Sequence, residues 1–169
     1  AAVGVGGVNA IMAYAGARQA GSVKIQNNKQ SITKAGAERA KLHSSGWEDG
    51  SVKDAINKFA PNAKPKLVIK REPVKYFNKE TNQMEDTIRE TRKMEYLNTK
   101  TNISVDHDLD GNYYRIRDTN LTGDKNCLGL DGKEIKNFRP VNGQNKSFTS
   151  KEFKDVYQMK THFNNTDKP

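Results

Sequence analysis

Hydrophobic and polar residues alternate along the chain on both sides of Asp110-Gly111, over residues 103–109 and 112–118. Alternation with a period of two places successive side chains on opposite faces of a β-strand. An Asp-Gly pair between two such runs is a strong signal for a tight turn that joins two antiparallel strands. The sequence therefore predicts a β-hairpin over this stretch.

The two loop residues also determine the register of the hairpin. With Asp110 and Gly111 in the loop, one face is mostly apolar and pairs Leu109 with Asn112, His107 with Tyr114, Val105 with Ile116, and Ile103 with Asp118. The other face is polar and pairs Asp108 with Tyr113, Asp106 with Arg115, and Ser104 with Arg117. Two arginines on one sheet face can bind a phosphate through parallel hydrogen bonds. A solvated face with a weak Asp106–Arg115 ion pair explains the same pattern equally well.

Two helices are predicted before this hairpin. The first spans residues 33–43, and the second begins where Ser51 and Asp54 resemble a capping box and ends before Pro61. Trp47, the single tryptophan, lies between these helices, and we expect it to pack on the core.

A third helix is predicted after the hairpin. Thr149 and Glu152 form a capping box, and Phe148 and Phe153 are spaced for a hydrophobic staple. This helix should end near Lys160, so that the residues after it form a polar tail.

The strand pattern is less regular elsewhere. Residues 67–69 and 74–77 are expected to be two strands interrupted by Pro73, since proline cannot donate to a strand ladder. Residues 83–97 fit a helix in their first half and a strand in their second half, and residues 126–130 are expected to be a short strand.

The beginning of the chain differs in composition from the rest. Residues 1–21 are rich in glycine and alanine, and residues 22–31 are a polar linker. We interpret residues 1–31 as the remnant of a preceding region and residues 32–169 as the folded domain. The expected fold class is α+β, with N-terminal helices packed on a twisted antiparallel sheet.

Charge points to a polyanionic partner. The 169 residues carry a formal net charge of +9 with a pI near 9.6, and the basic residues are spread along the chain from Arg18 to Lys168. A broadly basic domain favours nucleic acid, an anionic membrane or an acidic protein as partner. The single cysteine, Cys127, excludes an internal disulfide and a cysteine-cluster zinc site.

Aspartates offer one route to chemistry. Asp106-x-Asp108-x-Asp110-Gly111 resembles the opening of an EF-hand loop, but Arg117 stands where that loop needs a bidentate glutamate. Asp106 and Asp108, with Asp118 and Asp124, are also candidate ligands of a metal-dependent nuclease, although their spacing does not select that role.

Histidines offer a second route. Metal-free RNA cleavage needs a base for the 2′-hydroxyl, an acid for the leaving oxygen, and cations around the phosphorane. The chain has three histidines, His43, His107 and His162. His107 falls on the apolar face of the hairpin and is expected to be structural, whereas His162, next to Thr161 beyond the last helix, is expected to be free to act.

The order of several motifs resembles the C-terminal tRNase domains of contact-dependent growth inhibition toxins, which are polymorphic bacterial toxins with a barnase, EndoU, colicin and RelE-like fold. These motifs are Gly-Asn-Tyr-Tyr-Arg-Ile-Arg-Asp-Thr at 111–119, Leu-Gly-Leu-Asp-Gly at 128–132, Val-Asn-Gly at 141–143, Ser-Lys-Glu-Phe at 150–153 and Lys-Thr-His-Phe-Asn-Asn at 160–165. The chain departs from the family pattern at Cys127-Leu128-Gly129, where a Tyr-Leu-Asp-like run is more usual.

The resemblance implies a metal-independent ribonuclease that acts on tRNA in the target-cell cytoplasm. It would be delivered by a large secreted or cell-surface protein, with transient passage through a membrane, and neutralised by a cognate immunity protein. Some relatives are thought to need elongation factor Tu and GTP in the target cell; no other cofactor is expected. Transferred to matching positions, the catalytic candidates are His162, His43, Thr161, Arg117 and Thr119, and the substrate-binding candidates are Arg115, Tyr113 and Lys160.

Two other functions fit the same sequence. One is a metal-dependent DNase toxin that uses the aspartates. The other is a non-catalytic nucleic-acid-binding module, in which basic charge and an exposed Tyr113 would hold bases by stacking.

Overall fold

A computed structural model describes residues 31–169 of the chain. The interpretations of residues 1–30 as a remnant and a linker therefore lie outside the described residues. Two compact units are present: a larger one of Thr33–Glu72 and Arg89–Pro169, and a smaller one that contains Pro73–Ile88. No helix within the described part is long and apolar enough to cross a membrane.

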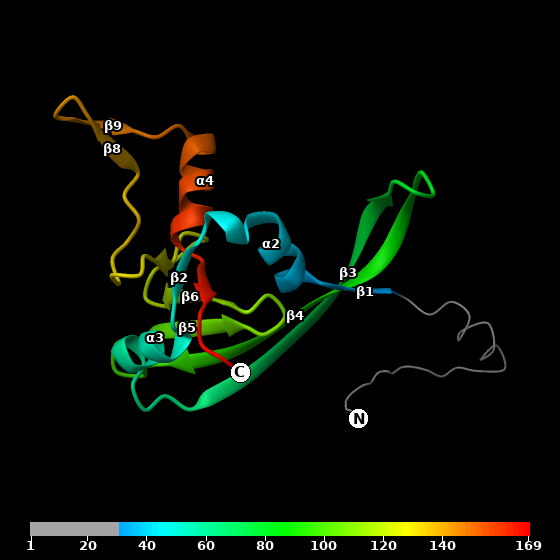
Figure 1. The fold of residues 1–169 in the computed structure, drawn as a ribbon, viewed down its shortest axis with the longest axis horizontal. Coiled ribbons are helices and arrows are strands. Elements are labelled where there is room, and N and C mark those ends of the chain that lie inside the picture. The colour runs from blue at the N-terminus through cyan, green and yellow to red at the C-terminus, as the bar shows by residue number, and fades with distance from the viewer. Residues whose placement is uncertain (1–30) are drawn as a thin grey trace. The chain divides into compact units, whose positions relative to one another are not determined.

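The fold is α+β, as expected (Figure 1). The helices are α2 (Ala35–His43), α3 (Val52–Phe59) and α4 (Ser150–Lys160), with a 3₁₀ turn, η1 (Ser44–Gly46). The strands are β1 (Ser31–Lys34), β2 (Glu48–Gly50), β3 (Pro65–Asn78), β4 (Gln83–Leu97), β5 (Ile103–Asp108), β6 (Tyr113–Asp118), β7 (Cys127–Leu128), β8 (Phe138–Val141), β9 (Gln144–Ser147) and β10 (Phe163–Asn165).

Eight strands form a mixed sheet in the order β1-β4-β5-β6-β10-β2, with β3 beside β4 and β7 beside β6, and β8 and β9 form a separate two-stranded sheet. The sheet was expected to be antiparallel, but β10 pairs with β2 in parallel. This architecture does not specifically match the barnase-like fold that the family resemblance implied. In this chain the C-terminal strand lies between β6 and β2, and β3 and β4 form a long hairpin.

The central hairpin has the predicted register. Val105 lies opposite Ile116 and Asp106 lies opposite Arg115, and the pairing runs from Ile103–Asp118 to Asp108–Tyr113. Asn112 closes the turn with a φ of 50°, a left-handed conformation that asparagine tolerates better than most residues. The alternation of the two strands was therefore sufficient to place every side chain of the hairpin on its correct face.

The apolar face of the hairpin forms the core of the larger unit. Val105, Tyr114 and Ile116 are buried there with Leu128 and Phe163, and α3 contributes Val52 and Ala55. Ser51 caps α3 as predicted, since its side chain accepts a hydrogen bond from the backbone N–H of Asp54 at 3.1 Å. Because the apolar face is packed in the core, the side chains of Asp106, Asp108, Tyr113, Arg115 and Arg117 lie on the opposite face of the sheet.

Helix α4 also begins as predicted. The capping box is complete, because Thr149 Oγ1 accepts from the Glu152 N–H at 3.2 Å and Glu152 Oε1 accepts from the Thr149 N–H at 2.9 Å. The rings of Phe148 and Phe153 stack with centroids 6.5 Å apart, as expected for the staple.

Several strand predictions were wrong. β3 is one strand that continues through Pro73, which an edge strand can accommodate because its outer N–H groups need no ladder partner. Residues 83–97 form the single strand β4, and the strand expected at 126–130 is only Cys127–Leu128. The hairpin of β8 and β9 was missed although Asn142-Gly143, both at positive φ, is a characteristic hairpin turn.

The end of the chain is not the polar tail that was expected. Residues 163–165 form β10, which pairs Phe163 with Tyr114 of β6 and with Glu48 of β2. His162 is therefore held between α4 and a paired strand, and it is only 4% exposed.

Candidate functional site

The polar face of the hairpin is divided into two parts with different chemistry. In the part far from the loop, Arg117 Nε donates to Asp106 Oδ2 at 2.8 Å, and its Nη2 lies 3.5 Å from Glu95. Asp106 also accepts from Ser104 Oγ at 2.5 Å and lies 3.8 Å from Lys93. The charge of Arg117 is thus neutralised by carboxylates within the sheet.

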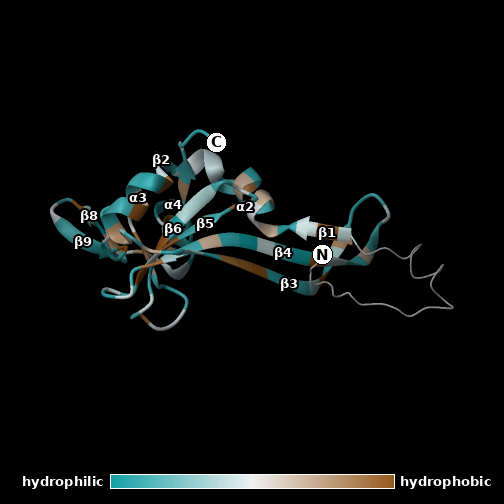
Figure 2. Cartoon of the chain, turned by 90° about the horizontal axis from the view of Figure 1, so that it is seen from below, coloured by the Kyte–Doolittle hydropathy of each residue, from teal (hydrophilic) through white to brown (hydrophobic). Residues whose placement is uncertain are grey.

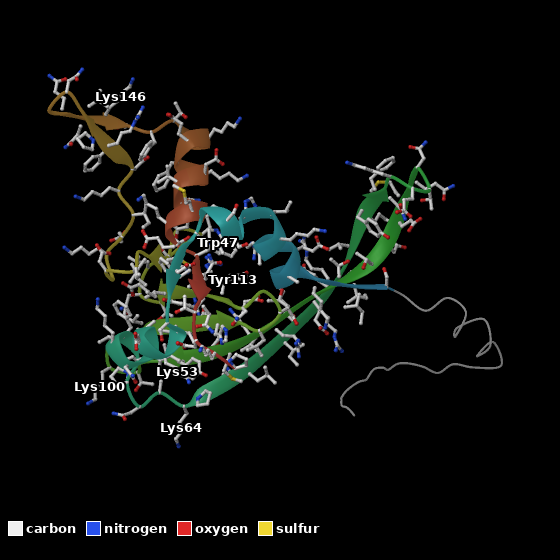
Figure 3. All side chains as sticks on the ribbon, in the orientation of Figure 1. Trp47, Lys53, Lys64, Lys100, Tyr113 and Lys146 are labelled. Carbon is white, nitrogen blue, oxygen red and sulfur yellow. The ribbon has the colours of Figure 1, made fainter. Side chains whose placement is uncertain are left out.

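The part near the loop carries an aromatic cluster of Trp47, Tyr113 and His162, here called the aromatic triad. The rings of Trp47 and His162 stack with centroids 5.0 Å apart and planes 18° apart, and Tyr113 lies 4.8 Å from Trp47 and 5.4 Å from His162. All three are buried, at 6%, 3% and 4% exposure. Trp47 and Tyr113 lie beside each other between α2 and the sheet (Figure 3).

Trp47 reaches this position because η1 turns the chain after α2, with the Trp47 N–H donating to the Ser44 carbonyl at 3.1 Å. We expected Trp47 to pack on the core, and it is buried, but it lies on the polar face rather than in the apolar cluster. Its indole Nε1 is a buried donor without a partner among the described residues.

His162 has a defined tautomer. Its Nδ1 lies 2.8 Å from the Gln158 carbonyl, which can only accept, so Nδ1 carries the proton. Nε2 is then a lone-pair acceptor, and it is buried without a partner among the described residues. Burial lowers the pKa of His162 to about 3, and the positive charges of Arg115, Arg39 and His43 contribute to the decrease. Near neutral pH this imidazole is therefore neutral, with a lone pair and no proton on Nε2.

Arg115 supplies the nearest unbalanced charge. Its Nη2 donates to Cys127 Sγ at 2.7 Å, while its Nε is a buried donor without a partner in the described part of the chain. In contrast to Arg117, Arg115 forms no ion pair with any described carboxylate. A guanidinium in this state, beside a neutral imidazole, is suited to hold an anion.

Arg39 of α2 adds a second cation. It is exposed, and its Nη1 donates to the Tyr113 hydroxyl at 3.2 Å. Burial raises the pKa of Tyr113, and the charge of Asp108 raises it further. Tyr113 therefore stays a neutral phenol, and its ring is too buried for the stacking on bases that an exposed Tyr113 would provide.

Three more candidates lie near the triad. His43 is the exposed last residue of α2, and Lys160 is the exposed last residue of α4. Thr161 is fully buried, and its hydroxyl donates to the Tyr157 carbonyl at 2.6 Å, 3.2 Å from Nδ1 of His162. Thr161 thus helps to hold His162 in place.

Two residues lie away from the triad. Thr119 is six positions along the chain from Tyr113, about 20 Å at roughly 3.3 Å per strand residue, and its hydroxyl donates to the Asn102 carbonyl at 2.7 Å. His107 lies on the apolar face as predicted, with Nε2 2.9 Å from Asn112 Oδ1. The structure therefore gathers His162, Arg115 and Tyr113, and leaves Thr119 outside.

Sequence reasoning missed two members of this site, Trp47 and Arg39. Trp47 stands between Gly46 and Glu48 as a single aromatic residue with no apolar periodicity around it, so nothing local showed which face of the sheet it would cover. Arg39 shares a short polar helix with Lys41 and His43, and only the packing of α2 against the hairpin brings it to Tyr113.

The aspartates are used locally. Asp106 is paired with Arg117, and Asp108 accepts the N–H groups of Asp110 and Gly111 at 3.1 and 2.7 Å. Burial raises the pKa of Asp108. Among residues 31–169, no group of three or more His, Cys, Asp or Glu side chains is arranged to hold a metal ion.

Comparisons with protein-family models, curated proteins and solved structures gave no match for this chain.

Proposed function

We propose that this chain is a metal-independent ribonuclease domain of a contact-dependent growth inhibition toxin, with tRNA as its substrate. The observation that carries the proposal is the placement of Arg115, a cation without an ion-pair partner among the described residues, beside the neutral base His162 in a chain of net charge +9. RNA supplies its own nucleophile, so a phosphate-binding cation and a proton acceptor are the main groups that the protein must provide.

Phosphate binding would activate the site. The positive charge of Arg115 helps to lower the pKa of His162, so a phosphate bound to that guanidinium removes part of the repulsion. The pKa of His162 would then rise from about 3, while the desolvation that is the largest cause of the low pKa would decrease only when the imidazole is uncovered. Substrate binding would thus make His162 a stronger base than it is in the free protein.

In the proposed reaction, Nε2 of His162 accepts the proton of a ribose 2′-hydroxyl, whose oxygen attacks the adjacent phosphorus. Arg115 stabilises the negative charge on the non-bridging oxygens. His43, in its charged form, gives a proton to the leaving 5′-oxygen as the P–O5′ bond breaks. The products are a 2′,3′-cyclic phosphate and a free 5′-hydroxyl.

Access to this site requires movement. Because Nε2 of His162 is buried, a ribose can reach it only after a covering side chain is displaced. The stacked indole of Trp47 is the neighbour whose displacement would expose the imidazole face. Thr161 and Arg117 then act as positioning residues for His162 and the hairpin, and Thr119 lies too far away for direct contact with the phosphate.

Partners follow from the same proposal. An immunity protein would present an acidic surface to this basic domain, since complementary charge accelerates association. Elongation factor Tu with GTP is a candidate host factor, and delivery would be by a large secreted or surface protein.

The test is cleavage of total bacterial tRNA by purified protein, with and without EDTA and with and without elongation factor Tu and GTP. We expect discrete tRNA fragments with 2′,3′-cyclic phosphate ends in the presence of EDTA, and their loss in His162→Ala and Arg115→Gln. His107→Ala is the matched control, because this histidine lies on the opposite face of the hairpin.

Other outcomes would contradict the proposal. Cleavage that EDTA abolishes, or degradation of DNA with intact tRNA, would favour a metal-dependent DNase. Tight RNA binding without cleavage under any condition would favour a non-catalytic module.

A further inference from the structure

A cavity of about 600 Å³ lies between α4 and the chain that leads from β7 into β8. Its walls include Leu130, Ile135 and Val156, together with the rings of Phe138 and Phe148. Cavities that hold small ligands have volumes of this size and combine apolar walls with a few polar groups. None of the candidate acid, base or phosphate-binding groups except Lys160 lines this cavity.

Two aromatic rings give the cavity a stacking surface. Phe138 at the start of β8 is 37% exposed, so part of its ring is open to solvent. Phe148 is held in place by its stacking on Phe153, 6.5 Å away. The β8–β9 sheet that carries Phe138 is otherwise mostly hydrophilic (Figure 2).

Basic side chains surround these rings. Lys133, Lys136, Arg139 and Lys160 all line the cavity, and none of them has an ion-pair partner among the described residues. The Lys136 ammonium lies 5.7 Å from the centroid of the Phe138 ring. An exposed ring flanked by unpaired cations is the arrangement by which proteins hold single-stranded nucleic acid, with the base stacked and the phosphates paired.

Acidic residues in the cavity agree with this chemistry. Asp131 Oδ1 already accepts the Lys133 N–H at 3.0 Å, while the carboxylates of Glu48 and Glu134 form no hydrogen bond within residues 31–169. A carboxylate can accept a hydrogen bond from the amino group of a nucleobase. These residues would therefore contact the base, in addition to repelling the phosphates of a bound nucleic acid.

The cavity is linked to the candidate active site through the chain itself. Val156 and Lys160 are four residues apart and share one face of α4, and His162 follows two residues later. One wall of the cavity and the candidate base His162 therefore belong to the same end of α4.

We propose that this cavity is a nucleotide-binding subsite that holds one unstacked base of a single-stranded RNA segment against Phe138, with the adjoining phosphates on Lys136, Arg139 and Lys160. This inference deepens the proposed ribonuclease function, and its test is a binding measurement that does not require cleavage.

The experiment measures fluorescence anisotropy of a labelled single-stranded oligonucleotide in which every ribose is 2′-O-methylated. This probe lacks the nucleophile, so it reports binding alone. We expect Phe138→Ala to weaken binding by about 5- to 100-fold, the range for loss of one base–aromatic stack. Phe138→Tyr keeps a ring and should bind as wild type does.

A matched pair on α4 tests the charge. Lys160→Gln should weaken binding and reduce the slope of log affinity against log salt concentration by about 0.7, the value for one phosphate of a single strand. Lys154→Gln makes the same charge change on the same helix but does not line the cavity, and it should leave the salt slope almost unchanged.

The proposal is overturned if Phe138→Ala, with an unchanged circular dichroism spectrum, binds the probe as tightly as wild type. It is also overturned if polyglutamate at matched charge competes as well as unlabelled RNA, since the cavity would then recognise acidic protein. Absence of tRNA cleavage by a wild-type protein that shows the Phe138 dependence would remove the ribonuclease function and leave the subsite in place.

Discussion

The imidazole of His162 stacks on the indole of Trp47 with ring centroids 5.0 Å apart. Trp47 follows α2 and His162 follows α4, so the contact joins segments that are far apart in the sequence. The stacked indole covers the imidazole on the polar face of the hairpin, and His162 is buried. The candidate site is therefore shut in the free protein, and its chemistry depends on how that stack opens.

Trp47→Phe should raise the pKa of His162 above about 3, toward the ordinary value of 6.5. The smaller ring leaves part of the imidazole in contact with water, which reduces the desolvation that is the largest cause of the low pKa. The measurement is an NMR titration of the His162 ring protons, with His107 as internal reference. An unchanged pKa of His162 in the variant would show that the indole does not control its hydration.

Acid should destabilise the protein through His162. Its folded pKa is about 3 and its unfolded pKa is 6.5, so the unfolded state binds the proton first as the pH falls. The free energy of unfolding should therefore decrease from pH 6.5 downward, by at most about 1.4 kcal/mol per pH unit for this group. Urea unfolding at several pH values checks this, and His162→Gln should have a shallower dependence. Parallel curves for the two proteins would contradict the assignment.

Arg117→Gln should cost more stability than Arg115→Gln. Removal of Arg117 leaves the buried carboxylate of Asp106 without its 2.8 Å partner, a loss of about 1–3 kcal/mol. Removal of Arg115 loses only its contact with the Cys127 thiol, and it also removes a buried Nε donor that has no partner among the described residues. Conversely, Arg115→Gln should reduce RNA cleavage more than stability. Equal unfolding midpoints for the two variants would show that the Arg117–Asp106 pair is not a structural interaction.

Gly36→Ala should destabilise the packing of α2 against the hairpin. A methyl group at this position would overlap the carboxylate of Asp108, so α2 or the hairpin loop would have to move, at a cost of about 1–3 kcal/mol. Gly46→Ala is the matched control, because nothing lies within 4 Å of the added carbon there. Thermal unfolding of both variants tests the difference, and equal midpoints would mean that the contact relaxes without cost.

The central hairpin and the starts of α3 and α4 could be read from the sequence because their signals are local, whereas the helix expected at 33–43 begins at Ala35, after strand β1. Asp110-Gly111 between two alternating runs determined a register that the structure reproduces pair by pair. The capping residues Ser51 and Thr149 likewise predicted where α3 and α4 begin, because a cap bonds only to N–H groups two or three residues away.

Only the tertiary structure decided the rest. Strand β10 exists because Phe163 pairs with Tyr114 and Glu48, which lie far away in the sequence, and that pairing is what buries His162. The contact between Trp47 and His162 and the isolated charge of Arg115 arise in the same way. A local pattern determines which face of a strand a residue occupies, but burial and the pKa that follows from it depend on which distant segment covers that face.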